Sequence, residues 1–100
     1  MARRSRDKGL AGEREVAVVW ESHGFAVRGL EGMGDHLAVG HGLTIHSEVK
    51  RAEGIRLWDW LGQCWDEAPA GTLPVLAYRR NRSPWVASLK LDDLCRVLSR

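Results

Sequence analysis

Four charged residues have the types and the order that metal-dependent hydrolysis of a phosphodiester requires. Gly34-Asp35 is followed, after twelve residues, by Glu48-Val49-Lys50, and Glu13 lies upstream of both. Carboxylates bind Mg²⁺ through oxygen, and a lysine beside them can orient the attacking water and stabilise negative charge on the phosphate. A Glu-x-Lys triplet is common by chance, so the prediction depends on the elements that bring these residues together.

A helix is expected to precede the stop signal His23-Gly24 and to place Glu13 on its packed face. Glu13 falls within an apolar stripe at helical spacing, whereas Glu15 lies about 160° away around the helix and can reach solvent. A carboxylate on a packed face is costly unless a cation receives it, so Glu13 is the functional candidate. The alternative is an internal salt bridge, for example with Arg28 or Lys50.

A predicted β-hairpin, with a tight turn at Gly40-His41-Gly42, brings the other three residues together. Side chains alternate along a strand, so Glu48 and Lys50 point to the same face, toward a polar cleft. The alternation sends Thr44, His46, Glu48 and Lys50 to this face, and Leu43, Ile45, Ser47 and Val49 to the other. Asp35 begins the partner strand, opposite the end that carries Lys50.

The whole pattern predicts one α/β domain with the element order α-β-β-β-α-β-β-α. The expected elements are a basic arm at 1–8, a helix at 9–22, strands at 25–28, 35–39 and 43–51, a helix at 57–68, strands at 73–80 and 85–89, and a helix at 91–98. An apolar content of 44% argues against disorder. No apolar run approaches the roughly 18 residues of a membrane helix, and no secretory signal is visible, so a cytoplasmic protein is expected.

Basic residues are clustered, although the net charge is only +2. Twelve of the fifteen are arginine, which is suited to forked contacts with phosphate oxygens. The clusters are Arg3, Arg4, Arg6 and Lys8; Lys50 and Arg51; and Arg79, Arg80 and Arg82. They predict contacts with a nucleic-acid backbone, and the alternative for each is a solvated surface, with a frayed tail at the N-terminus.

Cysteines and histidines do not predict a structural zinc site. Cys64 and Cys95 are far apart in the sequence and are interpreted as buried or idle thiols. None of the histidines has the spacing of zinc ligands: His23, His36, His41 and His46.

An ordered set of short segments runs through most of residues 8–90. The segments are Lys8-Gly9, Glu13-Arg14-Glu15-Val16, His23-Gly24-Phe25-Ala26-Val27-Arg28, Gly34-Asp35 and Glu48-Val49-Lys50, followed more weakly by Pro74-Val75-Leu76-Ala77 and the strand at Trp85. This set resembles the archaeal-type Holliday junction resolvases, including relatives carried by bacteriophages, in the PD-(D/E)XK nuclease superfamily. The resemblance implies a restriction-endonuclease-like fold, a central mixed sheet with flanking helices, and the element order reached from periodicity agrees with it.

The resemblance also implies roles for individual residues. Glu13 matches the family's helix glutamate, Asp35 its motif aspartate, and Glu48 and Lys50 the second motif. Gly34 stands where the first motif usually has proline. The looser matches are Arg14 and Arg28 as basic residues near the scissile phosphate, and Gln63 as a glutamine beside the site, for which an exposed helix glutamine is the alternative.

The expected mechanism uses Mg²⁺, with Mn²⁺ as a possible substitute. Asp35 and Glu48 are expected to bind the ion directly, with the carbonyl of Val49 as a third ligand. Glu13 would bind through water or hold a second ion, and Lys50 would orient or deprotonate the attacking water.

The expected function is the resolution of four-way DNA junctions by a homodimer, whose two sites match the two symmetric strands. Binding through backbone phosphates should depend strongly on salt and little on sequence. The first alternative is another PD-(D/E)XK nuclease that nicks DNA or cuts branched or flap DNA. The second is a DNA-binding module without catalysis.

Overall fold

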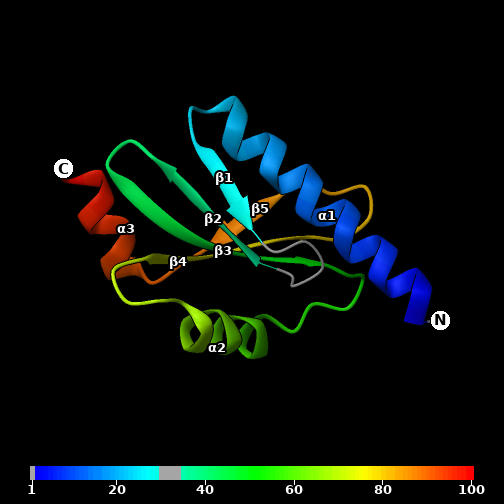
Figure 1. Cartoon of the computed structure of the whole chain (residues 1–100). Helices are drawn as coiled ribbons and strands as arrows, with labels where there is room; N and C mark the ends of the chain where they lie inside the picture. The colour runs from blue at the N-terminus through cyan, green and yellow to red at the C-terminus, as the bar shows by residue number, and fades with distance from the viewer. Residues whose placement is uncertain (1, 30–34) are drawn as a thin grey trace.

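A five-stranded mixed sheet forms the centre of the chain and carries helices on both faces (Figure 1). The computed structural model describes residues 2–29 and 35–100, with side chains from Gly9 onward. Its elements are α1 (Ala2–Ser22), β1 (Ala26–Gly29), β2 (Asp35–Gly40), β3 (Leu43–Arg51), α2 (Leu57–Glu67), β4 (Leu73–Arg79), β5 (Val86–Ser88) and α3 (Leu91–Leu98). The chain is a single α/β domain with the predicted element order.

Helix α1 is longer than predicted. It begins at Ala2 rather than at about Gly9, so the residues expected to form a separate basic arm extend the helix instead. Alanine, arginine and lysine are good helix formers, which accounts for the extension. Gly34 lies outside the described residues, as do the side chains of Arg3, Arg4, Arg6 and Lys8. All other boundaries agree with the predicted ones to within one residue.

Neighbouring strands of the sheet are also neighbours in the sequence, in the order β1-β2-β3-β4-β5. Strands β1, β2 and β3 form an antiparallel meander, and β4 and β5 form an antiparallel pair. Strands β3 and β4 run parallel, and α2 provides the crossover that parallel neighbours need. Strand β3 is therefore central and pairs on both of its edges.

A two-residue turn closes the hairpin of β2 and β3. His41 and Gly42 have φ values of 53° and 75°. Positive φ at both central positions is typical of a type I′ turn, whose twist matches that of antiparallel strands. The turn sets the register of the hairpin, which pairs Gly40 with Leu43 next to the turn and Asp35 with Glu48 at the far end.

The face of the sheet under α1 holds the apolar core. Val16 of α1 packs with Val49 and Ala77, and Trp20 donates a hydrogen bond of 3.1 Å from Nε1 to Oγ of Ser47. A second cluster, which Trp20 also contacts, consists of Ala38, Ile45 and Val75. These contacts confirm the predicted alternation along β3 for the face that carries Ile45, Ser47 and Val49.

Gly12 lets α1 lie close to the sheet. A Cβ atom at this position would lie 3.4 Å from Cβ of Arg51 and 3.4 Å from Cη2 of Trp85. Contacts of that length are at the lower limit of ordinary van der Waals contact, so a side chain larger than alanine would push the helix away. Since Glu13 is the next residue, the close approach at Gly12 also sets how near Glu13 comes to the sheet.

The opposite face of the sheet is covered by α2 (Figure 1). Leu61 and Cys64 of this helix are buried, and the ring of Trp60 lies 6.2 Å from that of Tyr78. Leu76 of β4, which pairs with Glu48 in the parallel register, is also fully buried. Among the described residues, no helix combines the length and the apolar character needed to cross a membrane.

Candidate metal centre

The register of the β2–β3 hairpin places Asp35 directly opposite Glu48. Paired residues on antiparallel strands share a face of the sheet, so the two carboxylates extend to the same side. His46 lies two residues before Glu48 on β3 and extends from that face too. The predicted convergence of positions 35 and 48 is present, and a histidine joins it.

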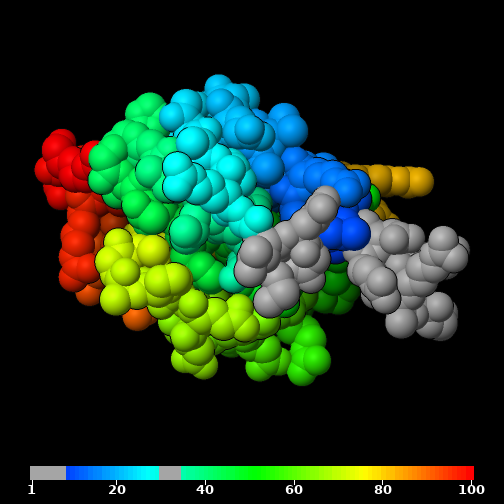
Figure 2. Space-filling model, viewed as in Figure 1, coloured from blue at the N-terminus to red at the C-terminus, as the bar shows by residue number. Residues whose placement is uncertain are grey.

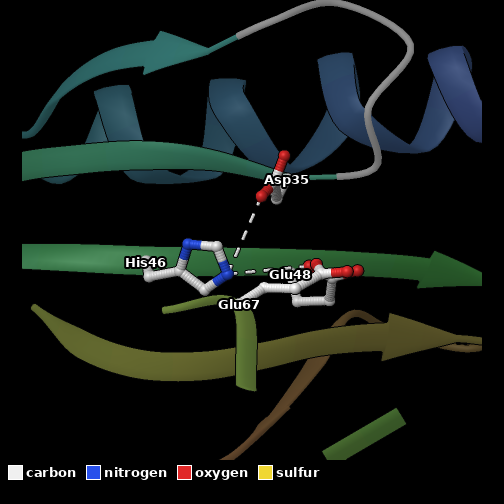
Figure 3. Close-up of side chains that lie close together, drawn as sticks. All are labelled: Asp35, His46, Glu48 and Glu67. Atoms are coloured by element: carbon white, nitrogen blue, oxygen red, sulfur yellow. Dashed lines mark ion pairs between the residues drawn. The ribbon is translucent and has the colours of Figure 1, made fainter. Parts of the chain in front are cut away.

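Four side chains gather at this point (Figure 3). The Nε2 atom of His46 lies 3.8 Å from Oδ2 of Asp35 and 3.7 Å from Oε2 of Glu48. Glu67 reaches the group from α2. One ligand atom of each of the four residues lies within 4.8 Å of the others, so three carboxylates and one imidazole face a common point.

The cluster is buried where it meets the sheet. The side chains of Glu48 and His46 are 0% and 4% exposed, whereas that of Asp35 is 28% exposed. Within the described part of the chain, no N–H group or hydroxyl donates a hydrogen bond to either carboxylate oxygen of Glu48, and Nε2 of His46 has no hydrogen-bond partner. Buried polar atoms without partners are rare and costly in folded proteins. These three atoms therefore suit a bound cation as their partner.

Burial is the main reason that the pKa of Glu48 rises from 4.5 to about 7. Lys50 opposes this rise, while the charges of Glu67 and Asp35 and a hydrogen bond between the carboxyl groups of Glu48 and Glu67 add to it. Burial, with the nearby charge of Glu48, also raises the pKa of Cys64 to about 12, so this thiol stays protonated at neutral pH. Cys64 thus agrees with the prediction of an idle buried thiol. Cys95 is exposed.

Lys50 and Gln63 reach the cluster from different elements. The Nζ atom of Lys50 lies 3.6 Å from Oε1 of Glu48, and its side chain is 26% exposed, so Lys50 borders both the cluster and the solvent. Gln63 is exposed on α2 and donates a hydrogen bond of 3.1 Å to Oε1 of Glu67. Lys50 therefore lies where the sequence predicts it, and Gln63 contacts the cluster through Glu67.

Glu13 is buried on α1, which packs on the face of the sheet away from α2. It shares a hollow of about 310 Å³ with Arg14 and Asp35. Glu13 is not one of the four clustered residues found in the described part of the chain. Binding through water or to a second ion stays a prediction for Glu13. The side chain of Val49 packs in the core under α1. Metal binding by its backbone carbonyl stays a prediction.

A second hollow, of about 350 Å³, lies on the α2 side of Asp35. Its lining includes Arg28, Asp35, His46 and Glu67. In Figure 2 the connection after α2 (yellow) and strands β1 and β2 (cyan to blue-green) appear on the same face. Asp35 borders both hollows, and each hollow also carries an exposed arginine, Arg14 in the first and Arg28 in the second. The two predicted phosphate-binding arginines thus flank the most accessible carboxylate of the sheet.

Glu15, which was expected to reach solvent, has a side chain that is 37% exposed, and three other side chains also contact it. Its Oε2 atom lies 3.0 Å from Nη1 of Arg51, and its Oε1 atom lies 2.9 Å from Nη2 of Arg79. Trp85 donates a further hydrogen bond to Oε1, at 3.2 Å. Arg51 and Arg79 therefore join α1 to β3 and β4. Their role in DNA binding stays a prediction, as does that of Arg80 and Arg82, which are exposed.

His46 and Glu67 are absent from the predicted site. Strand alternation places His46 on the same face as Glu48, and this pattern was the sequence signal that could have added His46 to the predicted site. Glu67 follows Gln63 by four residues and so shares its helix face, but its distance from Glu48 depends on how α2 packs on β3.

Comparison of the chain with protein-family models, with curated proteins and with solved structures found no significant match. The resemblance to junction resolvases stays a prediction from the motifs.

Proposed function

We propose that this chain is a metal-dependent endodeoxyribonuclease that cleaves branched DNA in the cytoplasm, with the four-way junction as its preferred substrate. The observation that carries the proposal is Glu48, which is fully buried and receives no hydrogen bond from an N–H group or hydroxyl on either carboxylate oxygen within the described residues. A buried carboxylate beside other acids needs cations to neutralise it. Lys50 supplies one positive charge near three carboxylates, and a divalent cation fits the remaining negative charge.

The donor atoms also fit a dication in their spacing. Bonds of about 2.1 Å to a shared ion keep its ligand atoms within about 4.2 Å of one another. The ligand atoms of Asp35, His46, Glu48 and Glu67 lie within 4.8 Å, so small side-chain rotations would bring them to one ion. Such an ion supplies Lewis-acid polarisation of a phosphoryl oxygen and a water of lowered pKa.

The protein's own residues perform the remaining tasks. Lys50, partly exposed beside Glu48, orients the attacking water and stabilises the negative charge that develops on the phosphate. Arg14 and Arg28 border the two hollows that meet at Asp35 and bind the phosphates on either side of the scissile one. Asp35 is accessible enough to lie next to the substrate.

A preference for junctions requires two sites with two-fold symmetry, since the junction presents two equivalent strands. Helix α3 supports a homodimer. Three leucines at helical spacing, Leu91, Leu94 and Leu98, are 72%, 37% and 76% exposed. An exposed apolar stripe of this kind is typical of an interaction surface. We assign it to the same stripe of a second copy.

The test compares a synthetic immobile four-way junction with a linear duplex of the same sequence, in Mg²⁺, in Mn²⁺ and in EDTA. Paired symmetric nicks in the junction alone, absent in EDTA and in Glu48→Gln, are expected. Equal cleavage of both substrates would replace the junction preference with a general nuclease. Binding without cleavage in either metal would contradict catalysis.

A further inference from the structure

We propose that His46 is a metal ligand and that its imidazole makes the site select a first-row transition dication, such as Mn²⁺, over Mg²⁺. The inference deepens the proposed function, because it identifies the ion used by the same site. Metal binding can be measured without DNA, however, so the two proposals can fail separately.

The environment of His46 supports its role as a metal ligand. Its side chain is 4% exposed, and its Nε2 atom has no hydrogen-bond partner among the described residues. The same atom points between Asp35 and Glu48 (Figure 3). An unpartnered imidazole nitrogen at this depth is costly, and a metal ion shared with the two carboxylates would satisfy it.

The spacing between His46 and the two carboxylates excludes direct hydrogen bonds. The distances from Nε2 of His46 to Asp35 and Glu48 are 3.8 and 3.7 Å. Hydrogen bonds between charged nitrogen and oxygen atoms are shorter, at about 2.7–2.9 Å. Ligand atoms on neighbouring positions of one ion lie about 3–4 Å apart when the bonds are about 2.1 Å long. The observed gaps therefore suit an ion between the side chains better than a proton.

The chemistry of the donor atoms favours a transition dication over Mg²⁺. Three carboxylates without the histidine would suit Mg²⁺, which binds oxygen and retains its waters. An imidazole nitrogen adds little for Mg²⁺ but strengthens the binding of first-row transition dications, least for Mn²⁺ and more for Co²⁺ and Zn²⁺. Because His46 is on the central strand and cannot withdraw to solvent, its contribution is built into the site.

The test measures metal binding to the DNA-free protein by titration calorimetry, with Mn²⁺ and Mg²⁺ as the probes. Wild type is expected to bind Mn²⁺ at least about tenfold more tightly than Mg²⁺. His46→Gln keeps a polar side chain but replaces the nitrogen ligand by an amide oxygen. It should weaken the binding of Mn²⁺ by about 10- to 100-fold while changing the affinity for Mg²⁺ little. The control is His23→Asn, which removes an exposed imidazole next to the end of α1, outside the cluster, and should leave the Mn²⁺ affinity unchanged.

A second readout does not depend on the folding of a variant. Electron spin-echo spectroscopy of Mn²⁺ bound to wild type should show modulation from a coordinated ¹⁴N nucleus. Absence of this modulation, or equal Mn²⁺ affinities of wild type and a folded His46→Gln, would overturn the inference. Nitrogen-coordinated Mn²⁺ in a protein that cleaves no DNA would uphold it and reject the proposed nuclease. Mg²⁺-dependent cleavage without the nitrogen signal would uphold the proposed nuclease and reject the inference about His46.

Discussion

Asp35 and Glu48 face each other across the β2–β3 pair, yet one is 28% exposed and the other is fully buried. The pair thus joins an anchored carboxylate, which is locked between the central strand and α2, to an accessible one at the edge of two hollows. The first suits permanent attachment of an ion, and the second leaves such an ion open to an incoming phosphate.

Asp35→Asn should abolish cleavage with little effect on folding. The amide retains the size of the carboxylate but loses the charge that attracts the ion, so the rate should fall by at least about 100-fold. Relief of repulsion with Glu48 should keep the free energy of unfolding within about 0.5 kcal/mol of wild type. Rates are measured on the junction with Mn²⁺. Asp92→Asn, on the first turn of α3, is the matched control and should be fully active.

Lys50→Ala should impair the chemical step more than DNA binding. Removal of the ammonium group next to Glu48 removes charge stabilisation that acts mainly in the transition state, so single-turnover cleavage should fall by about 10²- to 10³-fold. Junction affinity in Ca²⁺ should change much less, because Lys50 is one of several basic groups. Lys90→Ala is the control for loss of one positive charge. An equal loss of affinity and rate would show that Lys50 is only a phosphate contact.

Metal-free protein should lose stability as the pH rises from about 4.5 to about 7. The pKa of Glu48 is about 7 in the folded state and near its ordinary 4.5 when unfolded, so the folded state binds more protons in this range. The destabilisation at pH 8 relative to pH 4 should be at most about 3 kcal/mol, since one pKa unit corresponds to about 1.4 kcal/mol.

Urea unfolding in EDTA at several pH values measures this dependence. Glu48→Gln, which cannot ionise, should flatten it, and saturating Mn²⁺ should restore the stability of wild type at pH 8. If the free energy of unfolding depended on pH equally in wild type and in Glu48→Gln, the assignment of this dependence to Glu48 would be contradicted.

Glu15→Gln should destabilise the domain without a direct effect on the site. The substitution removes the negative charge that Arg51 and Arg79 share, and both arginines are largely buried, at 22% and 17% exposure. The expected loss is about 1–3 kcal/mol in the free energy of unfolding, measured by urea denaturation. Glu21→Gln, an exposed change on the same helix, should cost less than about 0.5 kcal/mol. Equal stabilities of the two variants would show that the pairing contributes nothing.

Leu98→Glu should dissociate the proposed dimer. A charge placed within a self-complementary apolar stripe would be buried against the leucines of the second copy, so the sedimentation coefficient should fall to the monomer value. Val18→Glu, which adds the same charge to an exposed position of α1, should leave it unchanged. Wild type that sediments as a monomer at micromolar concentration would exclude the paired-cut mechanism.

Local patterns in the sequence were sufficient for the strand that carries the site. Period-two alternation and the turn at His41-Gly42 determine which residues of β3 share a face and which residue of β2 pairs with Glu48. The convergence of Asp35, Glu48 and Lys50 was predictable for this reason. Short-range geometry of this kind follows from backbone stereochemistry, which depends little on the rest of the chain.

Contacts between distant elements were not predictable in the same way. The ion pairs of Glu15 were not predictable because helical periodicity describes the faces of one helix but not what packs beside it, and Arg79 is 64 residues away in the sequence. Glu67 joins the cluster only because α2 crosses over β3 on the way to β4.

The sequence by itself determined the order of the elements, the hairpin and the acidic pair that it presents. Only the tertiary structure decided that Glu48 is fully buried, that His46 and Glu67 complete its surroundings, and that Glu13 approaches from the opposite face. The physical reason is that burial and the spacing of charges are properties of packed elements: they are set by how α1 and α2 close on the two sides of the sheet, which no local pattern specifies.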